Sequence, residues 1–80
     1  MPTILRIKGY RFFFFSGEGQ EPSHIHVECA EKYAKFWLNP VSLVRSRGFR
    51  SHEIKELNAI VESHKEEFEE KWNEHFGDKA

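Results

Sequence analysis

The residues best suited to chemistry are two histidines, His24 and His26, which stand two positions apart in the segment from Glu21 to Val27. On an extended strand alternate side chains point the same way, so both imidazoles project from one face with Cβ atoms roughly 6–7 Å apart. That spacing allows both rings to bind one divalent metal such as zinc, and Glu28 continues the same row. The segment therefore predicts a metal site formed by His24, His26 and Glu28.

A catalytic zinc usually has three protein ligands, so the source of the third ligand matters. Glu21 and Glu28 are candidates, and His64 is a further one. His64 lies on the apolar stripe of a C-terminal helix, however, where a lone histidine is more often a hydrogen-bonded core residue. If that helix packs on the apolar sheet face, His64 is on the opposite side from His24 and His26.

Two other interpretations of His24 and His26 do not involve a metal. An imidazole titrates near neutral pH, so the pair could act as general acid and general base in RNA cleavage. Alternatively, both histidines are structural strand residues that lie beside Trp37 and contact the backbone or water. The sequence leaves these interpretations open.

A second candidate site is the basic cluster Arg45, Arg47 and Arg50, which includes the aromatic residue Phe49. Cationic side chains beside aromatic rings can bind phosphates and stack on bases, so the cluster predicts contact with RNA or another phosphate ligand. The alternative is structural: Arg45 and Arg47 would stabilise the negative end of a short helix and contact acidic residues of the next helix.

Composition limits the elements that can position these residues. The chain has 80 residues, of which 39% are hydrophobic, which is enough for one small domain spanning residues 1–80. There is no apolar run long enough to cross a membrane and no pattern typical of a secretory signal. The single cysteine, Cys29, cannot form an internal disulfide. We therefore expect a reduced, soluble, cytoplasmic protein.

Charge is unevenly distributed along the chain. Residues 1–50 contain 8 lysines and arginines and 4 acidic residues, whereas residues 51–80 contain 4 lysines and 9 acidic residues. The formal net charge of −1 argues against coating of nucleic acid by the whole surface. A local basic patch on the first part of the chain remains compatible with this distribution.

The first half of the chain has the composition of β-strands, rich in aromatic and β-branched residues. Pairing Val27 with Phe36 would give one apolar sheet face and leave the two histidines on the other. Lys8-Gly9 offers a tight turn because glycine tolerates positive φ. The strands are expected at residues 3–8, 10–15, 24–29 and 33–38.

The second half predicts two helices. Asn39 and Pro40 are favourable at a helix start, so a short helix is expected over residues 41–47, closed by Gly48. Ser51 is expected to cap a long helix that Gly77 stops. Its apolar stripe, spaced by three or four residues, consists of Ile54, Leu57, Val61, His64, Phe68, Trp72 and Phe76.

The run Phe12–Phe15 predicts an exposed apolar surface. Alternate residues of a strand point to opposite faces, so two phenylalanines should lie under the long helix and two away from it, near Trp37. A face of that kind favours a homodimer or a small partner protein, unless loop 16–22 or the short helix covers it.

Further sequence motifs are distributed over most of the chain: Met1-Pro2-Thr3-Ile4-Leu5-Arg6, Gly9-Tyr10-Arg11-Phe12-Phe13-Phe14, Glu21-Pro22-Ser23-His24-Ile25-His26-Val27, Ala34-Lys35-Phe36-Trp37-Leu38-Asn39-Pro40, Arg47-Gly48-Phe49 and Trp72-Asn73-Glu74-His75-Phe76-Gly77. Together these segments resemble the family called domain of unknown function 4160. Many members have proline where this chain has Ser23, and often Asp where it has Asn39. Members are small bacterial and archaeal proteins, some of them labelled toxin–antitoxin-like or regulatory, and the resemblance implies a role of that kind.

Together these observations predict an α+β fold: a mainly antiparallel four-stranded sheet, a short helix, and a long C-terminal helix packed on one face. The expected function is a small interaction or regulatory module that acts as a homodimer or with a partner protein. The alternative is a hydrolase or endoribonuclease, with or without a metal, that uses the face carrying His24 and His26.

Overall fold

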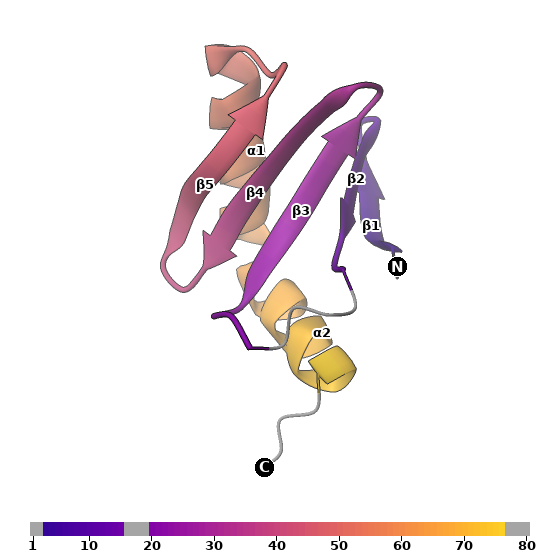
Figure 1. Ribbon diagram of the computed structural model, residues 1–80, viewed down its shortest axis with the longest axis vertical. Coiled ribbons are helices and arrows are strands. Elements are labelled where there is room, and N and C mark those ends of the chain that lie inside the picture. Colours follow the sequence, from indigo (N-terminus) through magenta and orange to yellow (C-terminus); the bar gives the residue numbers. More distant parts are fainter. Residues whose placement is uncertain (1–2, 16–19, 77–80) are drawn as a thin grey trace.

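The computed structural model describes residues 3–15 and 20–76, which form an antiparallel sheet and two helices. The five strands follow one another in space in the order β1-β2-β3-β4-β5, as Figure 1 shows. Both helices lie behind the sheet in that view, with α2 extending beyond its lower end. The elements are β1 (Thr3–Ile7), β2 (Tyr10–Phe13), β3 (His24–Cys29), β4 (Lys32–Leu38), β5 (Val41–Arg47), α1 (Ser51–Ser63) and α2 (Lys65–Phe76).

The prediction of a short helix over residues 41–47 is wrong, because this segment is the fifth strand, β5. Its pairing with β4 runs from Val41 opposite Leu38 to Arg47 opposite Tyr33. The register shifts at a β-bulge between Lys35 and Phe36. The Asn39–Pro40 peptide is cis and lies in the connecting turn. Hydrogen bonding to β4 and the β-branched residues Val41 and Val44 outweigh a local preference for helix.

The predicted register between β3 and β4 is wrong by two residues. Val27 pairs with Ala34 rather than with Phe36, and Phe36 pairs with Ile25. The reason is the turn, which is shorter than expected: Cys29 pairs with Lys32, so the hairpin loop has two residues and Ala30 adopts a φ of 56°. A shift of two residues preserves the faces, so the apolar and histidine-bearing sides remain as predicted.

The predicted single C-terminal helix is divided at His64, whose φ of −109° and ψ of 15° interrupt the helical geometry. Its start also differs from the prediction, because the N-cap is Arg50 rather than Ser51. The Glu53 carboxylate accepts a hydrogen bond from the Arg50 N–H at 2.8 Å, which supports this start. Gly77, predicted to stop the helix, lies outside the described residues.

One apolar core joins the helices to the sheet. Phe12 of β2 stacks on Phe68 of α2 with ring centroids 5.5 Å apart, and Phe14 meets Trp72 edge-on at 5.2 Å. Leu57 of α1 is buried in the same cluster. Neither helix is long and apolar enough to cross a membrane, as far as the described residues extend.

Polar contacts at the rim orient α1 on the sheet. Lys8 and Tyr10 both donate hydrogen bonds to the Glu56 carboxylate, at 3.0 and 3.1 Å, and Lys32 donates to Glu53 at 2.7 Å. The apolar core and these contacts occupy one side of the sheet. The opposite side, called the open face below, carries the candidate functional residues.

Candidate functional site

Strand pairing arranges the side chains of the open face in rows across the sheet, two of which contribute residues to a cleft described below. Residues paired directly on adjacent antiparallel strands share a face, with Cβ atoms about 4.5–5.5 Å apart. The first row is Phe13, His26, Lys35 and Arg45, and the second is Arg11, Glu28, Tyr33 and Arg47. The sheet therefore brings three cationic groups of β4 and β5 close to one histidine and one tyrosine.

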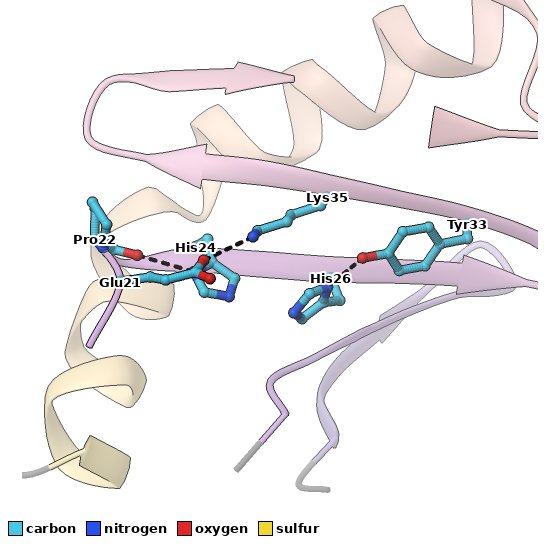
Figure 2. A network of polar contacts seen from close by, with 6 residues as sticks. All are labelled: Glu21, Pro22, His24, His26, Tyr33 and Lys35. Carbon is cyan, nitrogen blue, oxygen red and sulfur yellow. Dashed lines mark hydrogen bonds and ion pairs between the residues drawn. The ribbon is translucent and has the colours of Figure 1, made fainter. Parts of the chain in front are cut away.

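His24 and His26 project from the same face beside Trp37, as the strand pattern predicts. Their ring centroids are 5.0 Å apart, and the His24 ring lies 5.8 Å from that of Trp37. The Nδ1 of His24 donates a hydrogen bond to the Pro22 carbonyl oxygen at 2.9 Å, as Figure 2 shows. Trp72 covers the ring from α2 at 4.8 Å, so His24 has no exposed surface.

His26 differs from His24 because it reaches a cleft. Its Nδ1 is 2.8 Å from the Tyr33 hydroxyl, and its ring packs against Phe13 and Phe15, at centroid distances of 5.5 and 4.5 Å. Only 2% of His26 is exposed, yet its ring forms part of the cleft wall. These contacts hold the imidazole in one orientation.

The cleft has a volume of about 670 Å³ and lies on the open face over β3, β4 and β5. Within it Lys35 Nζ donates a hydrogen bond to Glu21 Oε1 at 2.8 Å, which Figure 2 shows beside the histidines. The Lys35 ammonium group also lies 5.0 Å from the centre of the Trp37 ring. The lining residues are Phe15, Glu21, His26, Tyr33, Lys35, Arg45, Ser46 and Arg47.

The structure divides the predicted basic cluster. Arg45 and Arg47 are exposed on β5 and line the cleft, whereas Arg50 precedes α1 and is not among the lining residues. Tyr33 also lines the cleft, although it was not predicted as a site residue. The alternation of side chains along β4 could have identified it, because Tyr33, Lys35 and Trp37 share the face of the histidines once β3 and β4 are paired.

The proposed metal ligands do not come together as a set of three. Glu28 follows His24 and His26 on the same face of β3 but pairs with Arg11, whose Nη1 is 2.8 Å from its carboxylate. His64 lies between the helices and contacts Glu67 at 3.2 Å. Among residues 3–15 and 20–76, no group of three histidine, cysteine or acidic side chains is placed to hold a metal ion.

The phenylalanine run is distributed as predicted, but less of it is exposed. Phe12 and Phe14 are in the core, whereas Phe13 and Phe15 lie on the open side. Phe13 is only 2% exposed because the Arg11 guanidinium stacks on its ring at 4.4 Å and Phe15 packs edge-on against it. Phe15, at 38% exposure, remains accessible at the cleft.

Charge separates the two sides of the molecule. The open face carries four cations and two glutamates, because Glu28 pairs with Arg11 and Glu21 pairs with Lys35, so that Arg45 and Arg47 give it a positive balance. The helices α1 and α2 contain eight glutamates and three lysines. Many of these glutamates are exposed on the helices, among them Glu66, Glu67 and Glu70. An anionic ligand is therefore attracted to the cleft side.

Comparisons with known proteins place the chain in a family. No curated protein and no solved structure matches it. A family model described as a domain of unknown function, DUF4160, matches residues 9–73, which include β2 to β5, α1 and most of α2. The chain belongs to the DUF4160 family.

Proposed function

We propose that this protein is a small module that binds single-stranded RNA through the cleft on its open face. The observation that carries the proposal is the convergence of the exposed Arg45 and Arg47 with the accessible ring of Phe15 in one cleft. Arginine and lysine side chains contact phosphates, and aromatic rings stack on unpaired bases. An exposed sheet surface with these two features is typical of modules that bind single strands.

The spacing of Arg45 and Arg47 suits an RNA strand that runs along β5. Arg45 and Arg47 are alternate residues of one strand, so their Cα atoms lie about 7 Å apart, close to the separation of neighbouring phosphates in an extended strand. Arg45 faces Lys35 across the β4–β5 pair, and Arg47 faces Tyr33. Two phosphates can therefore lie along β5 while a base reaches Phe15 or Tyr33.

Fluorescence anisotropy with a labelled single-stranded RNA of about 12 nucleotides tests this function. We expect binding at low salt that weakens steeply with added salt, and a loss of at least about tenfold in affinity for R45A/R47A, since two phosphate contacts are removed. The matched control is R50A/K55A, which removes two exposed cations outside the cleft. Equal losses in both double variants, or no binding at low salt, would contradict the proposal.

A second candidate function, protein interaction, is favoured by the edge strand β5. This strand ends the sheet and exposes the apolar side chains of Leu43 and Val44, so a homodimer or a partner protein could extend the sheet there. A regulatory, toxin–antitoxin-like role would involve such a partner. Light scattering at micromolar concentration tests the homodimer, and a 9.5 kDa particle would argue against it.

A further inference from the structure

We propose that an extended, acidic segment of a partner protein adds to the outer edge of β5 as a sixth strand and displaces RNA from Arg45 and Arg47. The strand addition stands on the properties of the edge, whereas the displacement rests on the proposed RNA binding. Three features that meet along β5 carry the inference: an edge with no neighbouring strand among the described residues, two exposed arginines, and exposed aliphatic side chains.

The backbone of β5 offers an edge that another strand can extend. It is the last strand in the order of the sheet and has seven residues. The outer side of such a strand presents N–H and C=O groups that an extended peptide can pair with. The opposite edge strand, β1, has five residues, and its apolar side chains Ile4, Leu5 and Ile7 are half-buried, so β5 is the better acceptor.

The open side of β5 favours acidic residues in the added strand. Arg45 and Arg47 are exposed, and neither forms an ion pair with a carboxylate of the described residues. The cations of the neighbouring strands, Arg11 and Lys35, already have glutamate partners. Opposite charges on adjacent strands stabilise the strand pair. Carboxylates at alternate positions of the added strand would therefore face both arginines.

The helix side of β5 favours aliphatic residues instead. Leu43 pairs with the core residue Phe36, so its side chain points towards the helices, yet it is 41% exposed at the edge. The glutamate-containing α1 lies against this side, which makes it unfavourable for further carboxylates. The β-bulge places Leu43 and Arg45 on opposite sides of the sheet, so regular alternation in the added strand serves both. The partner segment thus alternates acidic and aliphatic side chains.

A second copy of this chain fits the same edge less well. A two-fold pair of β5 strands would join the two open faces into one surface and gather four arginines on it. Like charges on adjacent strands are destabilising. The carboxylates that the edge favours therefore come from another protein.

The added strand and RNA exclude each other because both use Arg45 and Arg47. A strand paired with β5 places its carboxylates where the phosphates of a bound RNA would lie. Each ligand lowers the affinity for the other by the same factor, as linkage requires. The partner segment therefore regulates RNA binding.

Fluorescence anisotropy with a labelled peptide of about eight residues, alternating glutamate and valine, tests the strand addition. We expect R45A/R47A to weaken its binding by about 3- to 30-fold, because two exposed ion pairs are lost. R50A/K55A, which removes two exposed cations outside the cleft, is the matched control and should bind nearly normally. Equal losses in the two double variants would overturn the assignment to β5.

A peptide of the same composition, with all its glutamates before its valines, separates strand pairing from charge attraction. It should bind more weakly, because its carboxylates cannot all lie on the side of the arginines. Equal affinity for the two peptides would overturn the inference.

Amide chemical shifts of the isotope-labelled protein locate the alternating peptide. The largest changes should fall in β5, and changes centred on β1 would overturn the inference. Light scattering checks the rival occupant: a particle of twice 9.5 kDa that the peptide does not dissociate would show that a second copy holds the edge.

Competition tests the regulation. Excess unlabelled alternating peptide should release labelled RNA from the unmodified protein, and RNA that stays bound beside the peptide would refute the displacement. RNA binding without peptide binding would refute the inference and leave the proposed function standing. Peptide binding at β5 without any RNA binding would refute the proposed function and the displacement, and leave the strand addition standing.

Discussion

Two histidines two residues apart have different surroundings in this protein. His24 is enclosed by Trp37 and Trp72 and donates to the Pro22 carbonyl, whereas His26 meets Tyr33 and the cleft. His24 therefore fixes the segment that leads from Glu21 into β3. We therefore expect a structural role for His24, whereas His26 forms part of the cleft wall.

H24A should destabilise the fold without removing RNA binding. It deletes a fully buried ring between two tryptophans, and large-to-small changes in a core typically cost about 2–5 kcal/mol. Urea unfolding measures the loss, and anisotropy under native conditions measures RNA affinity. A variant as stable as the unmodified protein would contradict the structural role of His24.

Strand alternation was sufficient to predict that His24 and His26 share a face, because it depends only on local geometry. Their burial was not predictable in the same way. Trp72, which covers His24, is distant in sequence, and Phe15, which covers His26, follows the end of β2. The different roles of the two histidines depend on contacts that no local pattern contains.

At the scale of elements, β5 shows where the sequence pattern was ambiguous. Asn39, Pro40 and Gly48 together suit a short helix, yet Gly48 follows a strand and has a φ of +86°. A glycine that closes a helix usually adopts a left-handed conformation, and Gly48 does have a positive φ, but the element before it is a strand. The existence of β5 depends on pairing with β4, which also places Arg45 and Arg47 at the cleft.

Gly9 and Gly48, which both have a positive φ, should respond differently to alanine. Gly48 has a φ of +86°, and an added Cβ would lie 3.0 Å from Lys32 Cγ, so G48A combines backbone strain with crowding. Gly9 has a φ of +83° with open space around it, so G9A should cost only the strain, about 1–2 kcal/mol. Thermal unfolding should therefore show a larger loss for G48A, and an equal loss would contradict this crowding.

The contacts that dock α1 predict sensitivity to acid. The hydrogen bond from Lys32, then that from the Arg50 N–H, lowers the pKa of Glu53, and hydrogen bonds from Lys8 and Tyr10 lower the pKa of Glu56. A carboxyl pKa that is lower in the folded state than in the unfolded state stabilises the fold above the unfolded value, near 4.5. This stabilisation is lost as the pH falls through the lower pKa that the carboxyl group has in the folded state.

Urea unfolding across this acidic range is the measurement. The unfolding free energy of the unmodified protein should decrease as the pH is lowered. In E53Q/E56Q this decrease should be smaller. The control E66Q/E70Q removes two exposed glutamates of α2 that are outside these contacts. The control should keep the full pH dependence. If E53Q/E56Q also keeps it, the contacts that dock α1 are not the source of that dependence.

At the scale of the whole molecule, the fold separates charges that the sequence already divides between its halves. Four of the eight basic residues of the first half, Arg11, Lys35, Arg45 and Arg47, lie on the open face because β2 to β5 alternate. The glutamates of the second half lie on the helices that cover the other face. The charge division was visible in the sequence. Its arrangement on opposite sides required the strand pairing and the common core.

This arrangement predicts how binding of RNA depends on salt. For a single strand the logarithm of affinity falls with the logarithm of salt concentration with a slope of about −0.7 for each phosphate that is neutralised. If Arg45 and Arg47 each contact one phosphate, R45A/R47A should make that slope shallower by about 1.4. The control E66Q/E67Q changes the net charge by the same amount but with the opposite sign, and on α2 rather than at the cleft. It should leave the slope nearly unchanged. Equal slopes for R45A/R47A and the unmodified protein would show that the strand lies elsewhere, since neither arginine would then release counterions from the RNA.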